Sequence, residues 1–228
     1  RIGAVDEHGQ VLWGDRLLMI YSRDILAVKP GSTIISEVKA SQSLYDDIAK
    51  YGGRPVMWKT GHSLIKAKMK EEKAVLAGEM SGHMFFADRY FGYDDAVYAS
   101  CRLVEILAKS VKPLSALVAD LPDTTVTPEI RVDLPDAIKF DVVKRVRERF
   151  ETYAKTKQGL GPEQRRVREL VTIDGVRAVF EDGWGLIRAS NTQPALVLRF
   201  EATTPAKLDA IRAIVEGELA DVRQELER

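Results

Sequence analysis

Strand-like and helix-like hydrophobic patterns alternate through the first half of the chain. Short apolar or β-branched runs predict buried strands at residues 33–38, 55–59 and 74–77, after an N-terminal hairpin of residues 2–5 and 11–13. Between these runs, apolar residues recur at helical spacing and predict helices at residues 15–26, 43–51, 64–73 and 94–110. This alternation is typical of an α/β unit in which helices cover a sheet.

The predicted helix at residues 94–110 places Val97, Cys101, Val104 and Leu107 on one face, which we expect to be buried. Cys101 is the only cysteine of the chain, and we interpret it as a small core residue. A single cysteine allows no disulfide within the chain, which favours a cytoplasmic location.

The second half of the chain follows a different pattern. Four prolines between residues 112 and 135 predict a linker or hinge. Beyond it we expect a strand near residues 129–132, a helix at 138–153, strands at 169–173, 176–181, 185–188 and 195–201, and a last helix at 205–226. The Asp-Gly pairs at residues 174–175 and 182–183 are typical of tight hairpins. These features predict an α+β unit whose antiparallel strands have helices on one face.

Composition and charge narrow the classes of function. The 228 residues allow one large domain or two smaller ones, and 45% hydrophobic residues suffice for a core. Because 34 basic residues balance 34 acidic ones, nothing indicates a nucleic-acid or membrane surface. Arg1 runs directly into a strand-like segment, so we expect this chain to be part of a longer protein.

Residues 78–83, Gly-Glu-Met-Ser-Gly-His, form the first candidate site. Glu79 and Ser81 suit neighbouring hydroxyls of a polyol, and His83 can exchange a proton near neutral pH. A polar turn that happens to contain a histidine explains the hexapeptide equally well. Lys39 and residues 60–62, Thr-Gly-His, also follow predicted strands. Because ligand sites gather at the carboxyl ends of strands, we expect these segments to face one site.

Residues 188–194, Arg-Ala-Ser-Asn-Thr-Gln-Pro, form the second candidate site, between two predicted strands. An arginine with hydroxyl and amide donors on a tight loop suits a phosphate dianion. A polar connector without a ligand remains the alternative, since these residue types favour turns. We expect both candidate segments to bind opposite ends of one ligand.

Together the two segments, about a hundred residues apart, resemble the α-D-phosphohexomutase family, in particular its bacterial phosphomannomutase/phosphoglucomutase members. Residues 1–3 are similar to the end of that family's aspartate-rich metal loop, and residues 58–62 and Lys39 match as well. The resemblance covers the chain as the C-terminal half of a four-domain protein. It implies that residues 1–10 are the tail of domain two. Residues 11–122 would form domain three, a mixed sheet covered by helices, and residues 123–228 a mobile domain four with a fold like the TATA-binding protein.

The resemblance also implies which residues bind the substrate. Glu79 and Ser81 would hold two ring hydroxyls of the hexose, the contact that survives when the sugar turns over. Thr60 and Gly61 would contribute to the same sugar site. A second set would grip the phosphate that does not react: Arg188, Ser190, Asn191 and Thr192.

Four further residues are implied in catalysis. His62 and His83 would line the cleft as proton carriers or phosphate contacts. Lys39 would supply positive charge near the reacting phosphate, and Arg1 would lie beside the metal ion and the phosphoserine. The resemblance implies no metal ligand within this chain.

The implied activity is the interconversion of hexose 1-phosphate and 6-phosphate, for mannose or glucose, by an isomerase. It would run through a phosphoserine and a hexose 1,6-bisphosphate, with Mg²⁺ in the full-length enzyme. Because the phosphoserine and metal loops would precede Arg1, in the N-terminal domains of the same protein, we expect the chain alone to fold but to be inactive. The alternatives are a phosphoglucosamine mutase, disfavoured by Met80, a phosphosugar-binding module without catalysis, and a purely structural domain pair.

Overall fold

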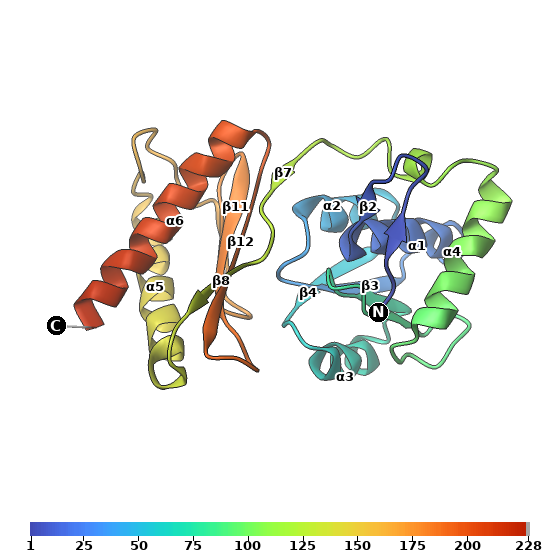
Figure 1. Ribbon diagram of the computed structural model, residues 1–228, viewed down its shortest axis with the longest axis horizontal. Helices are drawn as coiled ribbons and strands as arrows, with labels where there is room; N and C mark the ends of the chain where they lie inside the picture. The colour runs from blue at the N-terminus through green and yellow to red at the C-terminus, as the bar shows by residue number, and fades with distance from the viewer. Residues whose placement is uncertain (227–228) are drawn as a thin grey trace. The chain divides into compact units, whose positions relative to one another are not determined.

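The computed structural model describes residues 1–226, and the chain divides into two compact units, Arg1–Pro122 and Asp123–Arg228. The last two residues of the predicted domain 123–228 therefore lie outside the described residues. The elements of the first unit are β1 (Ala4–Val5), β2 (Val11–Leu12), α1 (Gly14–Val28), β3 (Thr33–Glu37), α2 (Gln42–Lys50), β4 (Arg54–Trp58), α3 (His62–Glu72), β5 (Leu76–Gly78), β6 (Met84–Phe86), α4 (Ala96–Ser110) and the 3₁₀ turn η1 (Ser115–Leu117) (Figure 1).

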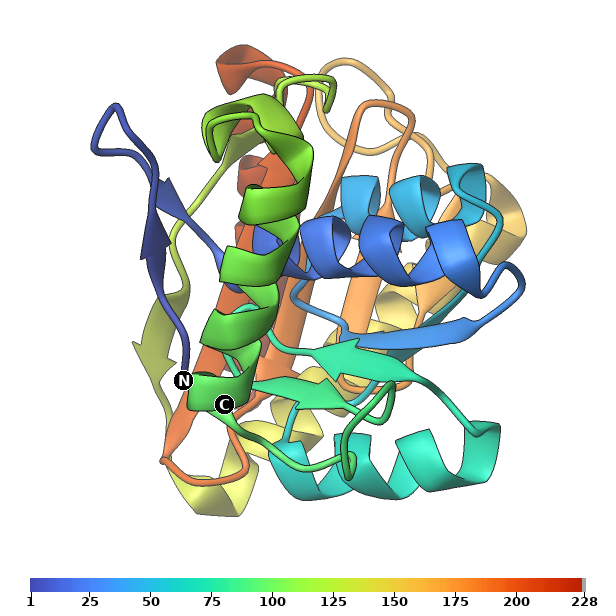
Figure 2. The ribbon, with the colours of Figure 1, turned by 90° about the vertical axis from the view of Figure 1, so that its right-hand side faces the viewer.

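The first unit is built on a four-stranded sheet in the order β4-β3-β5-β6. β3 pairs in parallel with β4 and β5, and β6 returns antiparallel to β5, so the predicted mixed sheet is confirmed. Ile34 and Phe86 pack with α1, α2 and α4, whereas Ile35 and Phe85 pack with α3 on the opposite face. Figure 2 shows α3 on one side of the sheet and α1 and α2 on the other. Burial on both faces explains why these strands are almost uninterrupted apolar runs.

The buried face of α4 differs from the predicted one. Val97 and Val104 are 75% and 64% exposed, and Cys101 is exposed as well, so its interpretation as a core residue is wrong. The buried residues are instead Ala99, Arg102, Leu103 and Ile106. Arg102 can be buried because its guanidinium pairs with Asp88 at 3.2 Å and lies over an aromatic ring. A charged side chain with such partners overrides the apolar pattern of the helix.

The second unit contains a six-stranded sheet with two helices. Its elements are β7 (Thr125–Val126), β8 (Ile130–Asp133), α5 (Asp136–Thr156), β9 (Glu169–Val171), β10 (Val176–Val179), β11 (Gly183–Ala189), β12 (Ala195–Ala202) and α6 (Pro205–Leu226). The order is β7-β12-β11-β10-β9, β8 also pairs with β12, and every pairing is antiparallel. Strand β7 lies in the segment predicted as a linker, which is a correction. The predicted α+β unit is otherwise confirmed.

Helices α5 and α6 cover the same face of this sheet (Figure 1). Their residues Val146 and Ile211 are fully buried against strand residues such as Ile187 and Phe200. Fully burying a side chain of this size stabilises a fold by about 1.5–3 kcal/mol. Each unit thus has a hydrophobic core of its own.

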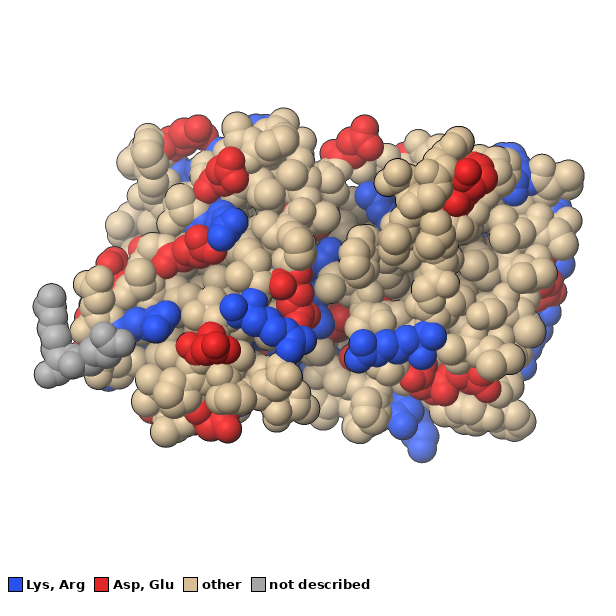
Figure 3. All heavy atoms as spheres, in the orientation of Figure 1, with Lys and Arg blue, Asp and Glu red and all other residues tan. Residues whose placement is uncertain are grey.

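The surface adds little that points to a partner. On the face drawn in Figure 3, basic and acidic side chains are interspersed, as the zero net charge leads one to expect. None of the helices within residues 1–226 is long and apolar enough to cross a membrane.

Candidate functional site

The predicted sugar-site segments lie at one edge of the first unit's sheet. Because β3, β4 and β5 run in parallel, their carboxyl ends meet at the same edge. The Gly61 amide, just beyond β4, donates to Oε1 of Glu79, just beyond β5, at 2.8 Å. The Met80 amide donates to Oε1 of Glu37, the last residue of β3, at 3.0 Å. Hydrogen bonds therefore join the ends of all three parallel strands.

Residues 79–83 form the tight turn between β5 and β6. The turn is closed by hydrogen bonds from the Glu79 amide to the His83 carbonyl and from the Gly82 amide to the Glu79 carbonyl, both 2.9 Å. Gly82 has a φ of +88°, and a Cβ there would overlap the carbonyl oxygen of Ile2. Gly14, at the start of α1, donates to the Met80 carbonyl at 3.2 Å, and a Cβ there would overlap the Glu79 carbonyl oxygen. Backbone on both sides thus holds the turn in one shape.

The carboxylate of Glu79 is held but not saturated. One oxygen accepts from Gly61, and the other accepts from the Ser81 hydroxyl at 3.4 Å. A carboxylate offers about four lone-pair positions, so two stay available for hydroxyl groups of a ligand. Glu79 is 5% exposed and Ser81 is half-buried, so such bonds would form in a partly dry environment.

Glu37 is a site residue that the sequence analysis missed. It is fully buried, and its Oε2 lies 3.5 Å from Nζ of Lys39. Burial raises the pKa of the Glu37 carboxyl; the charge of Lys39 lowers this pKa in part, and the nearby Glu79 raises it. The available signal was a carboxylate inside an apolar strand, two residues before a lysine that had been singled out.

The raised pKa of Glu37 predicts how stability depends on pH. A carboxyl whose pKa is higher in the folded than in the unfolded state favours folding less as pH rises from its ordinary value through its folded value. Between about pH 5 and pH 8, the free energy of unfolding of the wild type should therefore fall relative to that of Glu37→Gln. Urea denaturation of both proteins across this range measures the difference. A difference that stays constant or rises with pH would contradict the prediction.

The two histidines of the site differ in how they are held. His62 is the first residue of α3, two residues earlier than the predicted helix start, and its contact with the Ser63 hydroxyl is long, at 3.4 Å. His83 is bonded on both ring nitrogens, with Nδ1 2.5 Å from Oδ2 of Asp94 and Nε2 accepting from Nε of Arg1 at 3.0 Å. The two rings lie 6.2 Å apart, between centroids. The structure therefore brings Arg1, His62 and His83 together, and adds Asp94.

The arginine-led segment lies in the hairpin between β11 and β12 of the second unit. Arg188 is the penultimate residue of β11, and its Nε donates to Oδ2 of Asp174 at 2.9 Å. The Ser190 hydroxyl accepts from the amides of Thr192 and Gln193, at 3.3 and 3.1 Å, and so shapes the turn. Asn191 and Thr192 are exposed at its tip.

A buried lysine that the sequence analysis did not single out supports this hairpin. Lys139 of α5 is 4% exposed, and its Nζ donates to the carbonyls of Ser190 at 2.6 Å and Gln193 at 2.9 Å. Its charge satisfies two carbonyl groups that a loop of this shape turns inward. The helical pattern around Lys139 gave no signal of this role.

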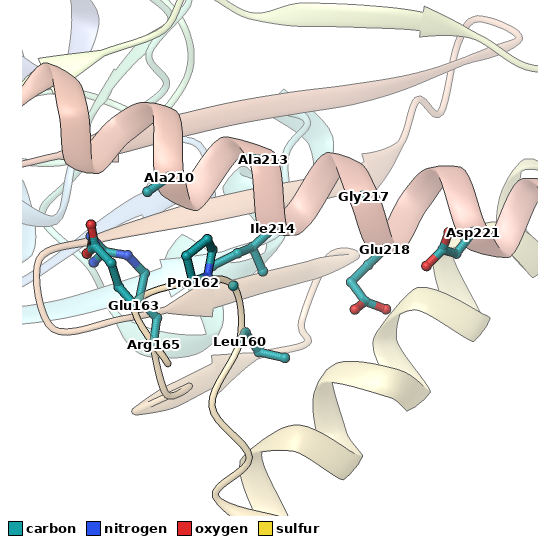
Figure 4. A pocket seen from close by; sticks show the side chains of 11 residues that line it. Leu160, Pro162, Glu163, Arg165, Ala210, Ala213, Ile214, Gly217, Glu218 and Asp221 are labelled. Carbon is teal, nitrogen blue, oxygen red and sulfur yellow. Dashed lines mark hydrogen bonds and ion pairs between the residues drawn. The ribbon is translucent and has the colours of Figure 1, made fainter.

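A hollow of about 410 Å³ lies elsewhere in the second unit, between the segment after α5 and the outer side of α6 (Figure 4). Its lining is largely apolar, with Leu160, Pro162 and Ile214, and it contains none of the predicted site residues. Glu218 points into this hollow but already accepts from Tyr153 and pairs with Arg149. The arrangement indicates no chemistry.

A metal centre was also sought among the described side chains. Within residues 1–226, no group of three or more His, Cys, Asp or Glu side chains is arranged to hold a metal ion. The assignment of magnesium ligands to another part of the protein stays a prediction.

Comparison with known proteins gives a consistent family. Residues 13–125 match the sequence profile of "Phosphoglucomutase/phosphomannomutase, alpha/beta/alpha domain III", and residues 129–218 match that of "Phosphoglucomutase/phosphomannomutase, C-terminal domain". The phosphomannomutase/phosphoglucomutase of Pseudomonas syringae pv. tomato is 45% identical over 227 residues, covering 100% of this chain and 46% of that protein. The phosphoglucomutase of Neisseria gonorrhoeae is 42% identical over 222 residues, covering 95% and 45%.

A solved structure agrees with these relatives. The crystal structure of a phosphoglucomutase/phosphomannomutase family protein from Burkholderia thailandensis matches with a TM-score of 0.84 and 42% identity, over 98% of this chain and 44% of that one. The chain thus spans about half the length of the relatives it matches. The resemblance drawn from residues 78–83 and 188–194 is confirmed. The chain belongs to the phosphoglucomutase/phosphomannomutase family.

Proposed function

We propose that this chain is the C-terminal part of a phosphohexomutase that interconverts the 1-phosphate and 6-phosphate of mannose or glucose. The observation that carries the proposal is the carboxylate of Glu79, which the Gly61 amide holds at the sheet edge beside the Ser81 hydroxyl. A carboxylate and a hydroxyl fixed in this way suit two neighbouring ring hydroxyls. The residue roles below rest on this proposal.

Phosphoryl transfer needs charge neutralisation and alignment more than covalent help from side chains. We assign the neutralisation of the reacting phosphate to Lys39 and Arg1, and proton movement to His83 with His62 nearby. Thr60 lies beside Gly61, whose amide acts on the sugar through Glu79. The remaining assignments concern the phosphate that does not react, and these residues are Arg188, Ser190, Asn191 and Thr192.

This division of work suits a reaction in which the substrate turns over. A hexose 1,6-bisphosphate must present first one phosphate and then the other to the same serine. A site that accepts both orientations should hold the sugar through few hydroxyls and the distal phosphate through a separate group of donors. Glu79 with Ser81 supplies the first kind of contact, and the hairpin of Arg188 supplies the second.

Magnesium and the phosphoserine are assigned to the N-terminal domains of the same protein. The described residues offer no cluster of ligands for the ion, so no step is assigned to it here. In the full-length enzyme, a bound magnesium ion would neutralise phosphate charge. A cytoplasmic location is part of the same proposal.

The test is an assay of the full-length protein with glucose, mannose and glucosamine 1-phosphates. We expect turnover of the first two and at least about tenfold slower turnover of the third, a margin of roughly 1.4 kcal/mol. The reverse order would support a phosphoglucosamine mutase. A thermal shift with hexose phosphates but no turnover would indicate a binding module, and no shift with any of them would indicate a structural role.

A further inference from the structure

His83 carries a hydrogen bond on each ring nitrogen, and together these bonds define its protonation pattern. Nε of Arg1 can only donate, so Nε2 of His83, 3.0 Å away, must accept. A neutral imidazole has one proton, which must then lie on Nδ1 and point to Oδ2 of Asp94 at 2.5 Å. The charged groups that face the ring are thus Arg1 and Asp94, with the ring of His62 6.2 Å away.

Asp94 is itself held in place. Its other oxygen, Oδ1, accepts from the backbone amide of Met84, the first residue of β6, at 3.2 Å. Asp94 also forms an isolated bridge with Phe85, the next residue of that strand. Because His83 immediately precedes β6, one strand end fixes both the histidine and its carboxylate partner.

We propose that Asp94 is a positioning residue that holds His83 in the Nδ1–H tautomer, so that Nε2 is the atom that takes a proton from a sugar hydroxyl. This inference rests on the proposed function for the identity of the hydroxyl, but not for the tautomer. In the transfer step, the hydroxyl oxygen forms a bond to phosphorus as the bond from phosphorus to the serine oxygen breaks. The electron pair of that bond passes to the serine oxygen, and the hydroxyl proton passes to Nε2. A substrate hydroxyl takes the place of Arg1 as the donor to Nε2.

The geometry makes Asp94→Asn an informative variant. The Met84 amide requires an acceptor at the Oδ1 position, so the asparagine carbonyl stays there and its NH₂ group turns toward His83. An NH₂ group donates to Nδ1, so the ring proton moves to Nε2 and the proton-accepting atom is blocked. In the Ser-His-Asp triad, an Asp-to-Asn exchange acts through the same change of tautomer.

Nitrogen-15 NMR of the histidine ring tests the tautomer directly. The chain has three histidines, so His8→Gln with His62→Gln leaves His83 as the only labelled imidazole. At alkaline pH we expect the proton on Nδ1 in this protein and on Nε2 after Asp94→Asn. A proton on Nε2 before the exchange, or an unchanged tautomer after it, would overturn the proposal. The first outcome does not depend on whether the variant folds.

Asp95→Asn is the matched control. Asp95 follows Asp94 directly and caps α4, accepting from the Tyr98 amide at 2.9 Å, and it has no bond to His83 among the described contacts. Asparagine also caps helices well, so this exchange removes the same charge with little structural cost. It should leave the His83 tautomer unchanged.

The kinetic arm uses the full-length protein. Asp94→Asn should lower kcat by roughly 10- to 100-fold with KM within about threefold, because proton transfer and not binding is lost. Asp95→Asn should stay within about threefold in both constants. Unchanged kcat in Asp94→Asn would overturn the proposal. Absence of mutase turnover in the wild type would overturn the proposed function and leave the NMR result to decide the tautomer.

Discussion

Arg188→Ala in the full-length protein should lower kcat/KM for a hexose phosphate by roughly 30- to 1000-fold. Loss of a charge-assisted hydrogen bond to phosphate costs about 2–4 kcal/mol of transition-state stabilisation, and each 1.36 kcal/mol is tenfold in rate. Arg188 suits this role because its Nε is held by Asp174 at 2.9 Å, which orients the guanidinium. Steady-state kinetics with glucose 1-phosphate and mannose 1-phosphate measure the loss.

The loss must be separated from damage to the fold, because Arg188→Ala also removes a partner of Asp174. Arg188→Lys keeps the positive charge but cannot make a bidentate contact, so we expect an intermediate loss. Arg212→Ala is the control, since Arg212 lies on the surface of α6 in an exposed pair with Glu216 at 2.8 Å. It should leave kcat/KM within about twofold. A loss below about tenfold in Arg188→Ala with Tm unchanged would count against the phosphate assignment.

Glu79→Ala should cost roughly 100- to 1000-fold in kcat/KM. The two lone-pair positions left on its carboxylate would accept sugar hydroxyls, and hydrogen bonds to a charged group are worth about 1.5–3 kcal/mol each. The sugar contact must persist through both half-reactions, so kcat should fall together with kcat/KM. Kinetics in both directions of the reaction check this expectation.

Glu79→Gln separates the charge of Glu79 from its structural bond. Glutamine keeps an acceptor for the Gly61 amide but presents an NH₂ group where Oε2 of Glu79 stands. It should retain the Tm of the wild type and still lose most of the activity. Glu71→Ala, at an exposed carboxylate of α3, serves as the control. Wild-type activity in Glu79→Gln would refute the sugar contact.

Most of the fold could be predicted from local patterns. The strand of residues 33–38, the helix of residues 43–51 and the Asp-Gly hairpins follow from spacing and turn chemistry that act over a few residues. The errors have a common cause. Arg102 is buried because of Asp88, and β7 forms because β12 offers a partner 76 residues later, at Glu201↔Val126. Neither partner can be read from the neighbouring sequence.

The candidate site was predictable in its chemistry but not in its support. Lys39, Glu79 and His83 carry side chains that suit a phosphosugar, and they follow strands, so their position could be inferred. Residues such as Gly14 and Lys139 act by fitting backbone that lies far along the chain. Their types are ordinary for a helix, so no local signal distinguishes them.

The sequence by itself determined the order of helices and strands, the family, and the reactive side chains at the strand ends, because periodicity and residue type are local properties. Only the tertiary structure decided that Asp94 faces Nδ1 of His83 and that Glu37 lies buried beneath the turn of residues 79–83. The physical reason is that the state of a buried charge or a ring proton depends on its partners in space. Those partners meet only when separate strands have assembled into one sheet.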